Sequence, residues 1–444
     1  MLRPPGPEPH FLIGNIPLAS PDPLAIFTAW ARKYGDIFYY RAAWLHVYFL
    51  NRPDLIDYVL VRNPQNFQKD KVIQNSRWLL GNGLLTAEGD EWRRQRRIIQ
   101  PAFSRQRLDA YALHMTAAAE QMLAGWQPGT IVNIHEEMMM VTLRVVMRAL
   151  FGLEGVETTT ISRALNTVMR NSVGARLLTP PWVRYLPLPG MRSVRHCVEQ
   201  MNAAVYQIIR QRRNGGRGAS DDFLSLLLEA RDDDGSVMTD VQLRDEIMTF
   251  LLAGHETTAL TLTWALYLID LDAGVEGKLH HELDRVLGER LTDISDLPAL
   301  VYTEQVLKET MRLYPPAWSL ARTAVEEFEL DGYRIPRGAN IVMSQWIMHR
   351  DPRYFADPEK FDPERWATTA CRDLPRFAYF PFGGGPRQCI GASFATAEAM
   401  LILATIASRV RLVAVDRELP VAVPSLTLRP RSAIRMRIEA RAHG

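Results

Sequence analysis

Runs of apolar residues along the chain predict a mainly helical protein. The longest run, residues 243–271, is apolar on nearly all sides. It predicts a helix of about 45 Å that passes through a core instead of lying over its surface. A second helix is expected at residues 299–314, where Pro315 and Pro316 stop it. A third is expected at residues 392–410.

Shorter apolar and aromatic runs predict small peripheral sheets. Strands are expected at residues 37–40 and 47–50, around 324–335, at 340–343 and within 411–444. Residues 88–170 carry apolar positions at helical spacing. The glycine-rich stretch 214–218 predicts a surface loop. Residues 220–222, which end at Asp222, are expected to cap the helix that follows. Residues 351–382, rich in proline and aromatic side chains, are expected to be irregular.

No repeat or inter-domain linker divides residues 1–444, so we expect a single large domain around a cofactor. The chain is 47% hydrophobic and 23% charged, as globular proteins are. A net charge of +2 gives no global preference for nucleic acid. The N-terminus lacks an apolar stretch of about 18 residues, so we expect a soluble cytoplasmic protein without a membrane anchor. Whether an anchor preceded Met1 stays open.

The cysteine content argues against a disulfide framework. The three cysteines are Cys197, Cys371 and Cys389. Three cannot all pair, and no C-x-x-C spacing supports a zinc or iron–sulfur site. A reducing compartment is therefore expected.

Cys389 is distinguished by its surroundings, Phe382-Gly-Gly-Gly-Pro-Arg-Gln-Cys-Ile-Gly391. The glycines allow unusual backbone angles and the close approach of a bulky partner. The helix predicted to follow favours the thiolate form of the cysteine at its N-terminus. Such a thiolate suits the axial ligation of a haem iron. The alternative, a buried structural cysteine in a turn, fits this whole frame poorly.

Polar residues interrupt the long apolar helix at Ala253-Gly-His-Glu-Thr-Thr258. Glycine inside a helix costs about 1 kcal/mol, and a buried glutamate costs more unless it has a partner. Threonine can donate to the carbonyl four residues earlier and loosen the helix. These departures indicate function, with a kinked, water-bridged core helix as the alternative. A second histidine at H-E-x-x-H spacing is absent, which excludes that type of zinc protease.

The cysteine frame fits the pattern F-x-x-G-x-R-x-C-x-G, and the chain resembles the cytochrome P450 superfamily of haem-thiolate monooxygenases. The matching residues are Phe382, Gly385, Arg387, Cys389 and Gly391. Further motifs recur in order from Trp92 onward, so the resemblance covers most of the chain. It implies a mainly helical fold in which haem b lies between the long core helix and the cysteine loop, with O2 as co-substrate.

The resemblance implies roles for the motif residues. Cys389 would be the iron ligand. Glu256 and Thr257 would deliver protons during catalysis, as the acid–threonine pair of the family does. A structural triad would join Glu309 and Arg312 of E-x-x-R to Arg365 of a later segment, Phe361-Asp-Pro-Glu-Arg-Trp366. In that segment Trp366 replaces the usual phenylalanine.

The resemblance also implies residues that bind the haem propionates. Trp92 and Arg96 match W-x-x-x-R and share one helix face. Arg322 and Arg387 correspond to further propionate-binding arginines, and Lys69 is a weaker candidate. A solvated surface charge is the alternative for each, and it is favoured for Lys69.

Positional matching to the family nominates five substrate contacts: Leu85, Ala253, Ala317, Trp318 and Leu426. All are apolar or aromatic, which fits a lipophilic substrate, although core packing is an equal alternative for each. Some relatives hold a fatty-acid carboxylate with an arginine and a tyrosine on the first sheet. Here Leu45 and Phe49 stand there, so a neutral terpenoid, steroid or alkyl substrate is favoured.

We expect no fused reductase, so electrons are expected from a separate ferredoxin or flavodoxin with its NAD(P)H reductase. Arg93, Arg94 and Arg97 lie off the Trp92 face and predict a basic patch for such an acidic donor, with helix solubility as the alternative. A monomer is expected. A peroxide-using or isomerase-type enzyme and a non-catalytic haem sensor remain alternatives, but the acid–threonine pair argues against all three.

Overall fold

The computed structural model describes residues 3–11, 14, 15, 17, 20–153, 191–214, 222–231 and 235–441. The helices expected at 154–170 and the loop at 215–218 lie outside these residues. The chain divides into two compact units. The first holds Met1–Lys71, Gln305–Cys389 and Leu419–Ser432, and the second holds Val72–Glu304, Ile390–Glu418 and Ala433–Gly444. That the chain is a single domain stays a prediction.

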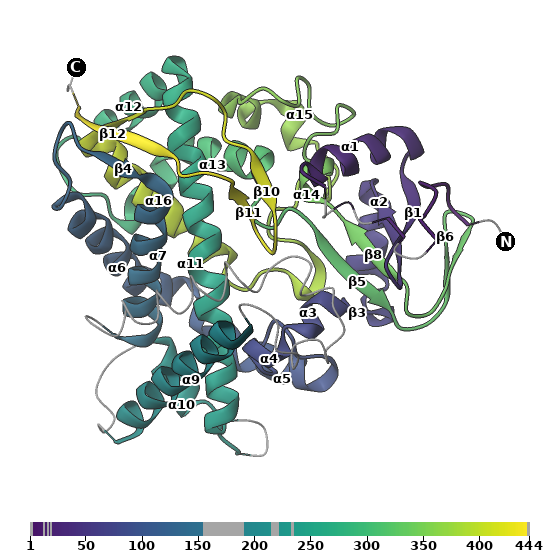
Figure 1. The fold of residues 1–444 in the computed structure, drawn as a ribbon. Coiled ribbons are helices and arrows are strands. Elements are labelled where there is room, and N and C mark those ends of the chain that lie inside the picture. The colour runs from purple at the N-terminus through teal and green to yellow at the C-terminus, as the bar shows by residue number, and fades with distance from the viewer. Residues whose placement is uncertain are drawn as a thin grey trace. The chain divides into compact units, whose positions relative to one another are not determined.

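The first unit is built on a five-stranded sheet of order β1-β2-β8-β5-β3 (Figure 1). Its strands are β1 (Ile37–Ala42), β2 (Leu45–Leu50), β8 (Asn340–Met343), β5 (Leu320–Ala324) and β3 (Phe67–Lys69). β2 pairs in parallel with β8, and the other pairs are antiparallel. The strands expected at 37–40, 47–50 and 340–343 are confirmed. The region around 324–335 contains the end of β5 and the hairpin of β6 (Phe328–Leu330) and β7 (Tyr333–Ile335).

The other elements of the first unit are mostly short. They are α1 (Pro23–Tyr34), α2 (Pro53–Asp57), the π-type turn η2 (Tyr58–Arg62), η3 (Pro64–Asn66), α14 (Gln345–Met348), η7 (Pro363–Ala367), α15 (Thr369–Arg372), η8 (Gly385–Arg387), β10 (Ala422–Pro424) and β11 (Leu428–Pro430). The Asp22 carboxylate caps α1 at the Ala25 N–H. Phe27 of α1 stacks on Phe49 of β2, with ring centroids 6.3 Å apart. Aromatic packing of this kind covers the sheet.

The second unit is mainly helical. Its helices are α3 (Lys71–Asn75), which begins at the boundary, α4 (Arg77–Leu80), α5 (Gly89–Ile99), η4 (Gln100–Phe103), α6 (Arg105–Leu123), α7 (Ile134–Phe151), α9 (Met191–Asn214), α10 (Phe223–Glu229), α11 (Asp240–Leu271), α12 (Ala273–Val286), η6 (Ile294–Ala299) and α16 (Ala392–Arg409). A small sheet of order β4-β12-β9 joins β4 (Ile131–Asn133), β12 (Arg435–Ala440) and β9 (Val410–Ala414). α13 (Val301–Leu313) carries residues of both units.

The predicted core helix is α11, which packs beside α7 (Figure 1). It begins at Asp240, three residues before the predicted start, because Thr239 and Gln242 form a capping box. The end at Leu271 agrees with the prediction. The predicted helices at 299–314 and 392–410 correspond to α13 and α16, and Asp222 caps α10 as expected. None of the helices in the described ranges is long and apolar enough to cross a membrane.

Candidate active site

Cys389 lies in the first unit, two residues after η8, and its side chain is exposed. By contrast, Cys197 is buried and Cys371 is half-buried. Burial raises the pKa of the Cys371 thiol, which disfavours its thiolate. The Cys389 N–H donates to the Phe382 carbonyl at 3.0 Å, so the loop closes on itself. Of the three cysteines, Cys389 is therefore the one that the fold presents to a ligand.

The glycines of this loop are required by the protein itself. Gly385 has φ +68°, and a Cβ there would lie 1.8 Å from the Leu60 carbonyl oxygen. A Cβ on Gly384 would lie 2.4 Å from the Phe377 ring. The unusual backbone angles expected of these glycines are confirmed at Gly385. At both positions the missing side chain also lets the loop pack against its own unit.

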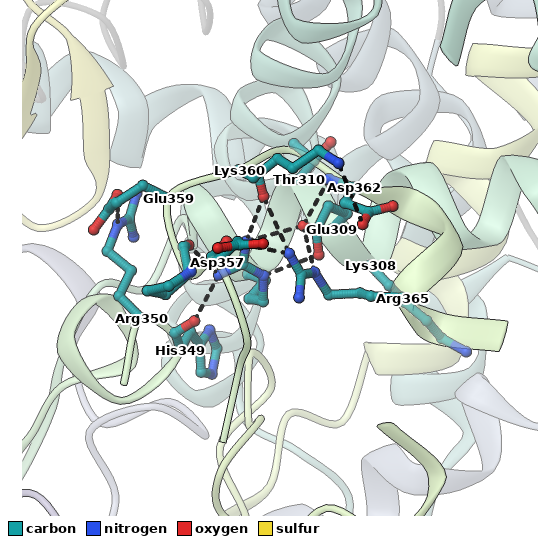
Figure 2. Close-up of polar contacts among 12 residues, drawn as sticks. Lys308, Glu309, Thr310, His349, Arg350, Asp357, Glu359, Lys360, Asp362 and Arg365 are labelled. Carbon is teal, nitrogen blue, oxygen red and sulfur yellow. Dashed lines mark hydrogen bonds and ion pairs between the residues drawn. The ribbon is translucent and has the colours of Figure 1, made fainter. Parts of the chain in front are cut away.

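The structure brings the predicted triad together in the first unit (Figure 2). Glu309 and Arg312 of α13 are fully buried, and Arg365 of η7 is 8% exposed. Arg312 donates from Nε and Nη2 to the two Glu309 oxygens, each at 2.9 Å. Arg365 Nε donates to Glu309 Oε1 at 2.9 Å. The Asp362 N–H and the Trp366 indole N–H donate to the same carboxylate, each at 3.0 Å.

Both arginines also fix the irregular segment that follows α14. Arg312 donates to the carbonyls of His349, Pro358 and Lys360. Arg365 donates to the carbonyls of Ala356, Asp357 and Lys360. Side-chain donors therefore satisfy backbone acceptors that no helix or strand could satisfy here. The predicted irregular character of residues 351–382 is confirmed apart from the short η7 and α15.

Three predicted propionate-binding cations lie in the first unit with Cys389. Lys69 of β3 and Arg322 of β5 are direct partners across the strand pair. The pairing brings two cationic side chains to the same position of the sheet. Arg322 is 8% exposed and donates to the Ala321 carbonyl at 2.9 Å. Arg387 ends η8 and is half-buried.

The second unit carries the predicted proton-delivery pair on α11. Between Leu243 and Asp270, all of which the structure describes, the only residues that are not buried are Ala253, Gly254 and Thr257. These three lie within one turn on one face. Glu256 points to the buried side and is 1% exposed. The core helix thus opens at the predicted motif.

Threonine hydroxyls bond back along α11 as expected. Thr257 Oγ1 donates to the Ala253 carbonyl at 3.0 Å, and Thr261 Oγ1 donates to the Thr257 carbonyl at 3.1 Å. Each hydroxyl competes for a carbonyl that the helix would otherwise use alone, which loosens the turn. Because a hydroxyl can rotate, Thr257 can also turn its proton toward the open face.

Trp92 and Arg96 lie one turn apart on α5 of the second unit, and both are half-buried. This spacing agrees with the prediction that Trp92 and Arg96 share one face of the helix. α5 carries Asp90 and Glu91 in its first turn, where the helix dipole favours them.

The predicted basic patch is smaller than expected. Arg94 is half-buried, and its Nη2 donates to the Ser236 hydroxyl at 3.2 Å. Arg93 is exposed and pairs with Asp90 one turn before it. Arg97 is exposed. A donor surface on α5 would therefore present Arg93 and Arg97, while Arg94 serves packing against the segment before α11.

Three of the five nominated substrate contacts come together in the first unit. The Trp318 indole N–H donates to the Ser425 carbonyl at 2.8 Å, which joins the segment after α13 to the β10–β11 turn. Trp318 is 8% exposed and its ring lies 5.9 Å from that of Phe27, so its side chain is packed in the core. Ala317 and Leu426 are half-buried on either side of this link.

Leu85 is the fourth nominated contact. It follows the loop at residues 81–84, which is hydrogen-bonded to α11 within the second unit. The Asp245 carboxylate accepts the Asn82 N–H at 2.7 Å, and the Glu246 carboxylate accepts the Leu84 N–H at 3.0 Å. Leu85 itself is half-buried. The fifth contact, Ala253, lies on the open face of α11 described above.

Two buried acids were missed by sequence reasoning. Glu246 of α11 and Glu398 of α16 are both 0% exposed, and burial raises the pKa of each carboxyl to about 8. The Thr258 side chain of α11 lowers the pKa of the Glu398 carboxyl, but by less than burial raises it. An acidic residue inside an apolar helix was the signal that could have found both. The sequence analysis applied this criterion only to Glu256.

Each unit, taken by itself, carries side chains of the kinds that a haem enzyme uses. The first unit offers an exposed cysteine in a closed loop and the opposed cations Lys69 and Arg322. The second offers a local opening in a core helix at Thr257. A thiolate ligand, cations for propionates and a polar opening for dioxygen are the side chains that a haem-thiolate enzyme requires.

Comparison with known proteins gives an independent result. Residues 4–433 match the family model described as Cytochrome P450. The chain is 37% identical over 404 residues to cyclooctatin synthase of Streptomyces melanosporofaciens, covering 90% of this chain and 88% of the relative. It is 36% identical over 389 residues to cyclooctat-9-en-7-ol 5-monooxygenase of that organism, covering 87% and 84%.

A third relative is pentalenene oxygenase of Streptomyces avermitilis, which is 34% identical over 416 residues, covering 93% of this chain and 92% of the relative. The family match spans nearly the whole chain and both units. This chain therefore belongs to the cytochrome P450 family and is a haem-dependent monooxygenase that uses O2.

Proposed function

We propose that this monooxygenase inserts one oxygen atom of O2 into a neutral terpenoid, with haem b held by Cys389. The observation that carries the proposal is the opening of α11 at Ala253, Gly254 and Thr257, in a helix that is otherwise buried from Leu243 to Asp270. A buried helix that exposes a hydroxyl and two small residues in one turn is built to admit small molecules there.

The haem, when bound, supplies the reductive activation of dioxygen and the oxidation of a C–H bond. Cys389 would hold it through its thiolate, which the loop presents at its exposed end. Arg322, Lys69, Arg387, Trp92 and Arg96 would bind the propionates, as the family resemblance implies.

Thr257 and Glu256 would supply protons. The Thr257 hydroxyl is half-buried on the open face and can donate either to Ala253 or outward. Glu256 directly precedes it in the chain and lies on the buried side. A hydroxyl that can rotate between two acceptors, next to a carboxyl group in the chain, is suited to pass a proton from the buried side to the open face.

A neutral, lipophilic substrate is supported by two observations. Leu45 and Phe49 of β2 are buried apolar residues, 8% and 1% exposed, where a carboxylate anchor would need cationic or hydroxyl groups. The names of the relatives describe oxygenation of pentalenene and of cyclooctat-9-en-7-ol. A terpenoid skeleton is therefore preferred over a steroid, a simple alkyl chain or a free fatty acid. Half-buried Leu85, Ala317 and Leu426 and exposed Ala253 would contact it.

Electrons would come from a ferredoxin or flavodoxin with its NAD(P)H reductase. The exposed guanidinium groups of Arg93 and Arg97 would favour an acidic partner. Arg93→Glu should slow electron transfer from a ferredoxin, and the effect should weaken at high salt. An unchanged rate at low salt would contradict this docking surface.

The ligand assignment is tested by Cys389→Ala. The reduced, carbon monoxide-treated protein should lose the red-shifted absorbance band of a thiolate-bound haem. Cys371→Ala serves as the control and should keep the band. Survival of the band in Cys389→Ala would contradict the assignment.

Thr257→Ala separates the monooxygenase from its alternatives. The variant should consume NADPH with a surrogate ferredoxin pair, form less product per NADPH and release more peroxide. Product formation with peroxide alone should change little, because that route needs no proton delivery. Equal coupling in variant and wild type would contradict the proton-delivery role of Thr257. Product from wild type with peroxide but not with NADPH would favour a peroxide-using enzyme, and absence of turnover in both assays would favour a haem sensor.

A further inference from the structure

His349 connects the buried arginine–carboxylate cluster to the cysteine loop within the first unit. We propose that His349 is a positioning residue that holds the Cys389 loop in the geometry needed for thiolate ligation, acting as an uncharged hydrogen-bond acceptor. This inference rests on the proposed role of Cys389 as the haem ligand. Sequence reasoning gave His349 no role.

Two contacts place His349 between the cluster and the loop, and Figure 2 shows His349 beside the cluster. Its carbonyl accepts from Nη1 of Arg312 at 2.9 Å, and Arg312 is bound to Glu309. Its imidazole Nε2 accepts the N–H of Phe380 at 2.9 Å. His349 is 0% exposed, so water cannot replace either contact without local opening.

Phe380 begins the turn that leads into the cysteine loop. Its carbonyl accepts the Gly383 N–H at 2.9 Å, and the Phe382 carbonyl accepts the Cys389 N–H at 3.0 Å. The Phe380 amide, which is bound to His349, is therefore followed along the chain by two backbone hydrogen bonds, and the second of them holds Cys389. Release of the Phe380 amide would free the first of these turns and, through it, the direction of the thiol.

Aromatic packing fixes the plane of the imidazole. Ring centroids of His349 and Tyr379 lie 4.9 Å apart, and those of His349 and Phe380 lie 5.3 Å apart. Tyr379 is itself held, because its hydroxyl donates to the Lys308 carbonyl at 3.0 Å. The Nε2 lone pair is therefore aimed at the Phe380 amide before any ligand binds.

The surroundings keep the ring uncharged. Burial first, then the guanidinium groups of Arg312 and Arg350, hold the pKa of His349 well below its usual value, and the backbone of Met311 and Arg312 opposes this only in part. Tyr379 is the titratable group that packs on the ring from the loop side. A protonated imidazole has no acceptor, so charging His349 would remove the bond to Phe380.

The test compares His349→Leu with His349→Gln in the full-length, haem-loaded protein. Glutamine can accept the Phe380 N–H without carrying a charge, whereas leucine cannot accept. In the reduced carbon monoxide complex, His349→Leu should raise the ratio of non-thiolate to thiolate absorbance about fivefold or more, the effect of one lost buried hydrogen bond. His349→Gln should restore the wild-type ratio.

A wild-type ratio in His349→Leu, with only a lower melting temperature, would overturn the proposal, because a merely structural residue would behave so. If His349→Leu does not fold, acid titration of wild type and His349→Gln replaces it. The thiolate band of wild type should be lost at a higher pH than that of His349→Gln, since glutamine does not titrate. Coincident titrations would also overturn the proposal.

His46→Gln is the matched control, because His46 is an exposed histidine of the same unit. It should leave both the ratio and the titration unchanged. Failure of the proposed function has a different signature, in which wild type itself shows no thiolate band at any pH.

Discussion

The indole N–H of Trp366 donates a 3.0 Å hydrogen bond to Oε2 of Glu309. Sequence reasoning treated Trp366 as a tolerable replacement of phenylalanine. The structure gives it a function that phenylalanine cannot perform, since a phenyl ring has no donor. The Glu309 carboxylate thereby accepts from two arginines, one backbone amide and one indole, and charge-assisted bonds of this kind are the strong ones.

Trp366→Phe should lower the free energy of unfolding by about 1–3 kcal/mol, because a hydrogen bond to a buried carboxylate is lost while the aromatic contact with Tyr379 can persist. Denaturant titration followed by circular dichroism measures the change. Trp44→Phe is the control, because Trp44 is 52% exposed and should tolerate the change. Equal stabilities of Trp366→Phe and wild type would show that the indole bond contributes nothing.

Arg312→Ala should give little haem-loaded protein. Removing one partner of a buried ion pair leaves an uncompensated charge and costs about 3–5 kcal/mol. The carbonyls of His349 and Pro358 also lose their donor, and that of Lys360 keeps only Arg365. The yield of folded protein, measured by haem absorbance per total protein, reports the effect.

The matched control for this change is Arg93→Ala, which breaks an exposed pair with Asp90 on α5. Exposed pairs of this kind contribute little, so the yield should stay at the wild-type level. A normal yield of Arg312→Ala would mean that Arg365 alone can satisfy Glu309.

Gly385→Ala should destabilise the cysteine loop more than Gly338→Ala does. Both glycines have positive φ, +68° and +79°, so both alanines carry a backbone strain of about 1–3 kcal/mol. The added Cβ would meet the Leu60 carbonyl at 1.8 Å in Gly385→Ala, whereas nothing lies within 4 Å of it in Gly338→Ala. Melting temperatures and haem content measure the difference. Equal losses in the two variants would show that the loop moves away from Leu60 at no cost.

Glu398→Gln should stabilise the protein increasingly as the pH rises from 5 to 8. Burial raises the pKa of Glu398 from 4.5 to about 8, so the folded state keeps its proton over this range while the unfolded state releases it. The wild type therefore loses about 1.4 kcal/mol of stability per pH unit at this site, and glutamine, which does not titrate, loses none.

Urea titrations of wild type and Glu398→Gln at pH 5, 6.5 and 8 measure this difference. Glu439→Gln, at a partly exposed ion-paired glutamate of β12, serves as the control and should give a nearly constant difference over this range. A constant difference between wild type and Glu398→Gln would contradict the raised pKa.

Local patterns in the sequence determined most of the elements of this protein. The apolar run at 243–271 became α11 with an error of three residues at its start, and the aromatic runs at 37–40 and 47–50 became β1 and β2. The spacing of apolar residues predicts these elements, because whether a helix or strand is buried on one face or on all faces is written in its own residues. The frame around Cys389 also sufficed to indicate the family, which the match over residues 4–433 confirms.

Tertiary structure alone decided which polar groups meet. The bond between Trp366 and Glu309 spans 57 positions, that between Phe380 and His349 spans 31, and that between Arg94 and Ser236 spans 142. No periodicity encodes such pairs, because a side-chain donor finds its acceptor only after distant elements have packed. Burial of Glu398 inside the second unit follows from the same packing. The sequence therefore indicated the chemistry of this protein, and the fold determined which neighbours hold and tune it.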